Sequence, residues 1–131
     1  MKKRSRKDLI KVIDEARRTY IRNRDLEHNG MAKCISCNSY SDNLQVGHYY
    51  SRRSDFTTEL GGDERNVNLQ CVPCNSHKRG NPRGYVVGLI RKYGKNSVIE
   101  LEQKRKEKYW KIKDLENLLK YYETQNKKLT Q

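Results

Sequence analysis

Four cysteines are the residues whose types and spacing point most directly to chemistry. They form two C-x-x-C pairs, Cys34 with Cys37 and Cys71 with Cys74, and the chain contains no other cysteine. A C-x-x-C turn aims two sulfur atoms at one point, so two such turns supply the four thiolates of a tetrahedral zinc site. Because protein ligands then fill the site, the spacing predicts a structural zinc and not one that activates water. Redox-active dithiols are the alternative, but the βαβ context of such motifs is missing.

A second set of polar residues lies between and just after the cysteine pairs. His48 is part of a predicted strand over residues 44–50, Asn66 precedes the second pair, and Asn75 and His77 follow it. Phosphodiester hydrolysis needs a base for water, a cation for the developing negative charge and a group that orients the base. A lone histidine is more often a hydrogen-bonded core residue. Between two zinc turns of a basic chain, however, His48 favours a catalytic role.

The charge balance indicates a polyanionic partner. Lysine and arginine number 29 against 16 acidic residues, which gives a net charge of +13. Such an excess favours nucleic acid over a merely solubilising surface, because it accompanies a zinc motif. Guanidinium and ammonium groups near the predicted site are candidates for contacts to DNA phosphates. They are Arg52, Arg53, Lys78, Arg79 and Arg83.

Helical periodicity marks both ends of the chain. Residues 6–27 carry apolar side chains at helical spacing and a lysine- and arginine-rich opposite face. A second helix is expected over 82–93, ended by Gly94, and the pattern is helical from Ser97 almost to the end. The last stretch carries a heptad-like stripe, which we expect to pack against the N-terminal helix; the alternative is a homodimer through the C-terminal helix. The stripe consists of Ile112, Leu115, Leu119 and Tyr122.

The middle of the chain is short and rich in loops. A loop is expected over 55–65 and an extended piece over 67–70. The predicted fold class is therefore α+β, with a basic N-terminal helix (1–30), a four-cysteine module (31–81) and a basic helical region (82–131). No apolar run approaches the roughly 20 residues of a membrane span. The basic N-terminus has no apolar stretch after it, so a secretory signal is not expected and the predicted location is the cytoplasm.

The combined pattern resembles a known family. A C-x-x-C turn, a strand that ends in His48, Asn66 before a second C-x-x-C turn, and then Asn75 together resemble the HNH nuclease superfamily, whose fold is the ββα-metal unit. More narrowly, most of the chain resembles the NinG (Rap) recombination proteins of lambdoid phages. The supporting segments are residues 20–25, Cys34-Ile35-Ser36-Cys37, Gly47-His48-Tyr49-Tyr50-Ser51-Arg52, residues 66–71, Cys74-Asn75, Gly80-Asn81 and Tyr85.

The resemblance implies a metal-dependent DNA endonuclease that acts on branched recombination intermediates such as Holliday junctions or D-loops, in the host cytoplasm if a phage encodes it. It places His48 at the general base, Asn66 at the asparagine that braces the base, and Asn75 at a ligand of Mg²⁺ or Mn²⁺, with His77 as a second candidate ligand.

One departure from the superfamily is visible, because Gly47 stands where many HNH enzymes carry a metal-binding Asp or His. No single acid could be chosen to replace it; the nearest carboxylates are Asp42, Asp55, Glu59, Asp63 and Glu64. Three alternatives stay open at this point: a non-catalytic zinc protein that binds DNA structures, an HNH enzyme of homing or restriction type that cuts a specific duplex sequence, and an RNA-binding zinc protein.

Overall fold

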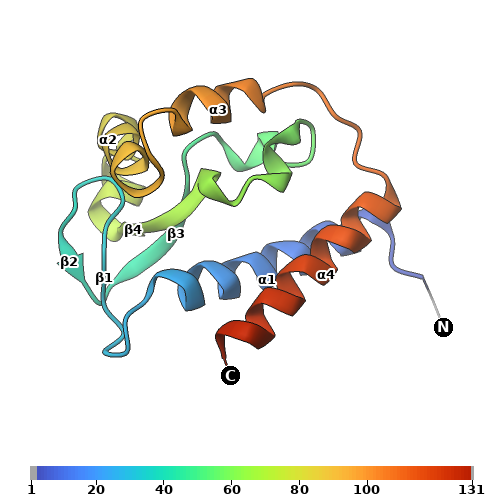
Figure 1. Cartoon of the computed structure of the whole chain (residues 1–131), viewed down its shortest axis with the longest axis horizontal. Helices are drawn as coiled ribbons and strands as arrows, with labels where there is room; N and C mark the ends of the chain where they lie inside the picture. Colours follow the sequence, from blue (N-terminus) through green and yellow to red (C-terminus); the bar gives the residue numbers. More distant parts are fainter. Residues whose placement is uncertain (1–2, 131) are drawn as a thin grey trace.

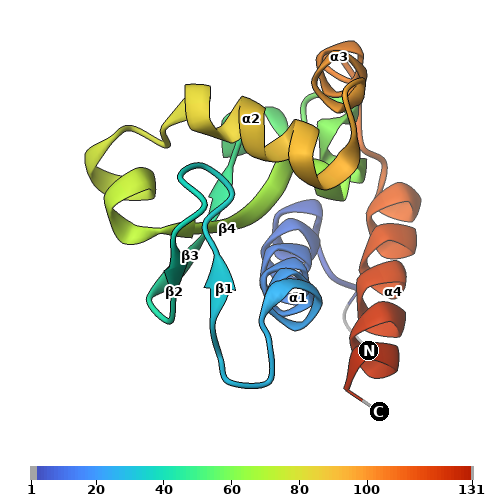
Figure 2. The ribbon, with the colours of Figure 1, turned by 60° about the vertical axis from the view of Figure 1, so that its left-hand side comes forward.

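Two long helices at the ends of the chain lie side by side and support a small sheet. In the computed structural model, which describes residues 3–130, α1 (Arg6–Asp25) packs along α4 (Ile112–Leu129), and both lie on the same side of the hairpin β3–β4 (Figure 1). The other helices lie across the opposite side of the hairpin, as Figure 2 shows. The bounds of the remaining strands and α-helices are β1 Ala32–Lys33, β2 Tyr40–Ser41, β3 Leu44–His48, β4 Val67–Cys71, α2 Pro82–Tyr93 and α3 Ser97–Gln103.

The hairpin β3–β4 is antiparallel and pairs Leu44 with Cys71 at one end and His48 with Val67 at the other. Alternate residues of a strand point to opposite faces. One face carries apolar side chains that join the core under α1 and α4, among them Leu44, Val67 and Leu69. The other face of β4 is polar, yet it is fully buried: Asn68 and Gln70 are each 0% exposed, as is Asn66 just before the strand.

Helix α1 begins and packs as its sequence predicts. Ser5 caps it, because its side chain accepts from the Asp8 N–H while the Asp8 carboxylate accepts from the Ser5 N–H. Ile13 and Ile21 are completely buried. The helix ends at Asp25, two residues before the predicted end.

The C-terminal region differs from the prediction of one helix from residue 97 almost to the end. Helix α3 ends at Gln103, and the chain runs without helix until α4 begins at Ile112. Trp110 explains the break: it is buried, its ring lies edge-on to Phe56 at 5.5 Å, and its indole N–H donates to the Thr58 carbonyl at 2.8 Å. This tertiary packing overrides the helix propensity of the lysine- and glutamate-rich segment.

The apolar stripe of α4 packs against α1, as we expected. Leu115, Leu119 and Tyr122 are buried in the same core as Ile13 and Ile21. Ile112, in contrast, is 42% exposed. A homodimer through α4 would therefore have to use a face other than the buried stripe.

None of the helices within residues 3–130 combines the length and apolar character needed to cross a bilayer.

Candidate metal centre and adjoining basic pocket

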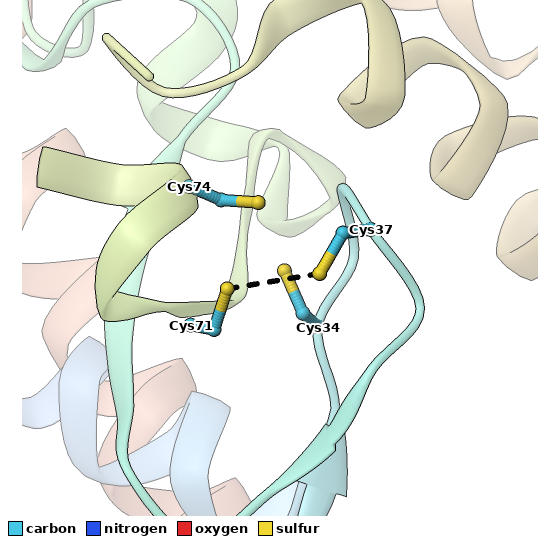
Figure 3. A group of neighbouring side chains, drawn as sticks. All are labelled: Cys34, Cys37, Cys71 and Cys74. Atoms are coloured by element: carbon cyan, nitrogen blue, oxygen red, sulfur yellow. Dashed lines mark hydrogen bonds between the residues drawn. The ribbon is translucent and has the colours of Figure 1, made fainter. Parts of the chain in front are cut away.

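The four cysteine thiols converge on one point. The Sγ atoms of Cys34, Cys37, Cys71 and Cys74 all lie within 4.8 Å of one another. Figure 3 shows the four side chains pointing toward one another. The Cys37 and Cys71 sulfur atoms are 3.7 Å apart. Thiolates at the usual Zn–S distance of about 2.3 Å in a tetrahedron lie about 3.8 Å apart, so the group fits one zinc ion. The predicted four-ligand set is thus brought together, and this group can hold a structural metal such as zinc.

Local backbone geometry shapes both turns. In the first turn the Asn38 N–H donates to the Cys34 carbonyl at 2.9 Å, and Asn38 adopts a positive φ of 62°. In the second, Cys71 is the last residue of β4 and Cys74 lies in a π-helical turn, Pro73–His77. The Asn81 side-chain amide donates to the Cys74 sulfur at 3.3 Å. Such outer hydrogen bonds orient metal ligands and tune them.

The thiols differ in acidity. Burial raises the pKa of Cys34, and it raises the pKa of Cys74 to about 12. Burial also acts to raise the pKa of Cys37, but hydrogen bonds from Ser39 bring it down to about 6. Buried thiols with a raised pKa ionise when a metal cation compensates their charge. Metal binding at this group would therefore be coupled to deprotonation of the buried thiols.

His48 lies at the end of β3 against a buried cluster of charges. Its Nε2 atom is 3.0 Å from Asp55 Oδ2 and 3.4 Å from an Arg17 nitrogen. Arg17 also donates to Asp55 Oδ2 at 2.6 Å and to Asp14 Oδ1 at 2.8 Å. The side chains of Arg17 and Asp55 are 3% and 1% exposed. Among the five carboxylates considered from the sequence, Asp55 is thus the one that the fold brings to His48.

Asn66 braces the chain just after His48. Its side-chain Oδ1 accepts from the Tyr50 N–H at 2.8 Å, and its Nδ2 donates to the Tyr50 carbonyl at 3.0 Å. The Asn66 carbonyl also accepts from the Tyr49 N–H at 2.9 Å. Both hydrogen-bonding groups of the Tyr50 backbone are therefore held by one buried amide. This arrangement agrees with the bracing position that the resemblance implies.

A pocket of about 380 Å³ joins His48 to Asn75. It lies where α1 faces β3 and the turn Pro73–His77, and its lining is Asp14, Arg17, Arg18, Arg22, Gln45, Val46, His48, Arg52 and Asn75. Asn75 donates from Nδ2 to the Gln45 side-chain oxygen at 2.8 Å. Four guanidinium groups beside an imidazole make this pocket suited to an anion such as a phosphate.

Most of the other predicted site residues lie outside this pocket. Arg52 contributes to the lining and pairs with Asp14. Five other candidates are not among the described residues that line the pocket, and all five are exposed on the surface. They are Arg53, His77, Lys78, Arg79 and Arg83. His77 follows Asn75 by two helical positions, which turns its side chain to a different face.

Sequence reasoning missed the contribution of α1 to this site. Arg17, Arg18 and Arg22 were visible only as part of a basic helix face, and Asp14 carried no local signal. Arg24, from the same face, turns inward and pairs with Asp25 at 2.7 Å. Helical spacing separates the inward and outward arginines only when the packing partner of the helix is known.

A preformed site for a catalytic divalent cation is not part of this arrangement. Within residues 3–130, the four cysteines are the only group of three or more His, Cys, Asp or Glu side chains that converge on one point. Asp14, the carboxylate of the pocket, is already paired with Arg17 and Arg52. The donors at the pocket therefore do not fit a preassembled Mg²⁺ or Mn²⁺ site, which usually includes one or two free carboxylates.

Fold and centre together define a small α+β protein organised around a four-cysteine site that can bind a metal ion. The family model described as Bacteriophage Lambda NinG protein matches residues 1–131. The chain belongs to the NinG family. It is 35% identical over 121 residues to the protein ninG of Escherichia phage 933W and to that of Escherichia phage lambda, and 36% identical over 121 residues to that of Salmonella phage P22.

Each of these alignments covers 92% of this chain but only 56–57% of the relative. The chain thus spans little more than half the length of the curated relatives that it matches. No solved structure matches the chain.

Proposed function

We propose that this chain is an HNH-type DNA endonuclease that hydrolyses a phosphodiester bond in the pocket between α1 and β3. The observation that carries the proposal is the joint presence of His48, Asn75 and four arginines in one pocket. Three further features support it: the strands β3 and β4 precede a helical turn, His48 ends the first strand, and buried Asn66 braces the following residues. This is the order expected of a ββα unit.

The proposed reaction assigns one proton transfer to the protein. His48 takes a proton from water, and the water oxygen forms a bond to phosphorus. One P–O bond of the diester breaks, and the departing oxygen later takes a proton from solvent. Arg18, Arg22 and Arg52 stabilise the negative charge on the phosphoryl oxygens.

The resemblance also implies a divalent cation, which when bound would stabilise charge on the departing oxygen. Asn75 is the residue of the pocket that the resemblance assigns to it, and His77 is exposed away from the pocket. The described residues of the pocket include no free carboxylate, so we assign no step of the reaction to the cation. Whether cleavage requires a divalent cation is tested directly in the experiment below.

We propose branched DNA as the substrate and the host cytoplasm as the place of action, both from the resemblance to the NinG recombination proteins. The net charge of +13 supports a polyanionic substrate without selecting among DNA structures. Two cuts at a junction would suit a homodimer.

The proposal is tested by incubating the zinc-loaded chain with a mobile four-way junction and with a linear duplex of matched sequence. The reaction is run under three conditions: with Mg²⁺, with Mn²⁺ and without added divalent cation. We expect junction cleavage with a divalent cation, and we expect His48→Ala to abolish cleavage while DNA binding remains. His28→Ala is the matched control, because His28 is an exposed histidine outside the pocket. Binding without cleavage under every condition would refute the nuclease proposal.

A second candidate function is a non-catalytic zinc protein that recognises DNA structure. Gly47 favours it, because glycine offers no ligand where many HNH enzymes bind their metal. The ion pairing of Asp14 favours it too. The same experiment separates the two functions, since this candidate predicts junction binding that His48→Ala leaves unchanged and no cleavage at all.

A further inference from the structure

We infer that Asp55 and Arg17 are positioning residues that hold His48 with its proton on Nε2, so that Nδ1 is the atom that accepts the proton of water. This inference rests on the proposed function and deepens it. It identifies which imidazole nitrogen performs the proton transfer and which side chains determine that choice.

Arg17 has no hydrogen on its NH2 nitrogen left to donate to His48. Its NH2 nitrogen carries two hydrogens, and the same nitrogen lies 2.8 Å from Asp14 Oδ1 and 2.6 Å from Asp55 Oδ2. Both hydrogens are therefore used by carboxylate oxygens. None remains for His48 Nε2, which lies farther from this nitrogen, at 3.4 Å.

Asp55 accepts a hydrogen bond from His48. Nε2 is 3.0 Å from Asp55 Oδ2, and a carboxylate oxygen accepts but does not donate. Burial acts to raise the pKa of Asp55, but the hydrogen bond from His48 and the charge of Arg17 hold that pKa below its usual value, so Asp55 is ionised at neutral pH. Nε2 must therefore be the donor, and the proton of the neutral ring lies on Nε2.

The other ring nitrogen of His48, Nδ1, faces solvent. Among residues 3–130, no group makes a hydrogen bond to His48 Nδ1, and this atom is not one of the buried polar atoms without a partner. It is therefore accessible to solvent. His48 lines the basic pocket, so its Nδ1 lone pair is available to a water molecule there.

The positioning pair is itself fixed from two sides. Asp14 binds Arg17 and also Arg52, so four charges alternate in sign along the path from Arg52 to Asp55. The Arg17 guanidinium further lies 6.0 Å from the ring centre of Phe56. When Nδ1 takes a proton, the imidazolium is next to the Asp55 carboxylate, which stabilises it, as the carboxylate of a catalytic triad does.

The direct test is nitrogen NMR of zinc-loaded protein labelled with ¹⁵N-histidine. Long-range couplings to the ring protons identify which nitrogen of His48 carries the proton. We expect the Nε2–H tautomer in the wild type, its loss to a tautomer mixture in Asp55→Ala, and its retention in Asp55→Asn, whose amide oxygen can still accept from Nε2. The Nδ1–H tautomer in the wild type, or no change in Asp55→Ala, would overturn the inference.

Kinetics provide the second readout. We expect Asp55→Ala to lower kcat for junction cleavage about 100-fold with little change in KM, because Asp55 is buried and does not reach DNA. Asp55→Asn should restore part of the loss. Asp63→Ala is the matched control, since Asp63 is also a largely buried carboxylate paired with an arginine, Arg65, but it does not touch His48. A control that lowers kcat as much as Asp55→Ala would show a general structural effect and overturn the positioning role.

The two readouts separate this inference from the proposed function. If the wild type does not cleave DNA, the nuclease proposal fails, while the NMR experiment still decides which nitrogen of His48 carries the proton next to Asp55 and Arg17. If the wild type cleaves DNA but carries the Nδ1–H tautomer, the nuclease proposal stands and the positioning inference fails.

Discussion

Replacing Asn66 by alanine tests whether one buried amide holds the loop that carries His48. The side chain is 0% exposed and makes two hydrogen bonds with the Tyr50 backbone, at 2.8 and 3.0 Å. Its removal leaves one N–H and one carbonyl without their partner. Each such group costs about 1–3 kcal/mol when fully buried. Because Tyr50 is only half-buried, water can satisfy part of the loss, so we expect a total of about 2–3 kcal/mol.

The assay is thermal and urea unfolding of the zinc-saturated protein, followed by circular dichroism. For a domain of this size, each 1 kcal/mol lowers Tm by about 3–5 °C, so Asn66→Ala should lower it by about 6–15 °C. Asn75→Ala is the matched control, because the same atoms are removed at a less buried position with one side-chain hydrogen bond to Gln45. We expect it to cost under about 1 kcal/mol. Equal shifts for the two variants would refute the reasoning that the double contact to Tyr50 distinguishes Asn66.

Three further predictions follow from the metal centre, the hairpin and the pocket. A strong zinc chelator should unfold residues around the cysteines, seen as loss of protease resistance that zinc restores, because metal binding supplies folding free energy in small metal domains; unchanged resistance after complete zinc removal would contradict this. Gly47→Ala should destabilise the protein by about 1–3 kcal/mol, since a Cβ there would overlap the buried Gln70 side chain. Gln70 is itself held by Ser36 and the Gly80 carbonyl; chemical denaturation should show that Gln70→Ala relieves much of the penalty in the double variant, and additive penalties would be inconsistent with the overlap. Finally, replacing Arg18 and Arg22 together by alanine should reduce the slope of log K against log salt for DNA binding by about 2, because each phosphate contact contributes roughly 0.9; an unchanged slope would exclude α1 from the DNA interface.

Local patterns made the metal centre predictable. The two C-x-x-C turns each place their sulfurs by short-range backbone geometry. The strand 67–71, which leads into the second turn, and its partner 44–48 are recognisable extended segments. The bracing role of Asn66 was predicted from the family resemblance. The two hydrogen bonds between its side chain and the Tyr50 backbone are compatible with that role. These predictions needed few contacts between residues far apart in the chain.

The basic pocket could not be predicted in the same way. Arg17 meets Asp55 across 38 positions of sequence, and nothing near either residue indicates the other. The break between α3 and α4 has a similar cause, because Trp110 reaches back 52 positions to Thr58. Local propensity and periodicity do not detect such partners, so they predicted a continuous helix there and did not single out Asp14 and Arg17 as neighbours of His48.

The buried charges of Asp14, Arg17 and Asp55 allow one more test of what this cluster does. Ion pairs that are buried often contribute no more stability than well-packed apolar residues of similar volume, because desolvation offsets their attraction. If the cluster serves His48 and not the fold, the combined variant Asp14→Leu, Arg17→Met and Asp55→Leu should unfold within about 2 kcal/mol of the wild type in urea. The same protein should bind junction DNA more weakly but detectably through Arg18 and Arg22, and it should not cleave it. In contrast, Arg17→Met alone should cost about 3–5 kcal/mol, because buried Asp55 then loses its arginine partner and Asp14 keeps only the exposed Arg52. A combined variant as unstable as the single one would show that the charges hold the fold together and would remove the argument that they are kept for the imidazole.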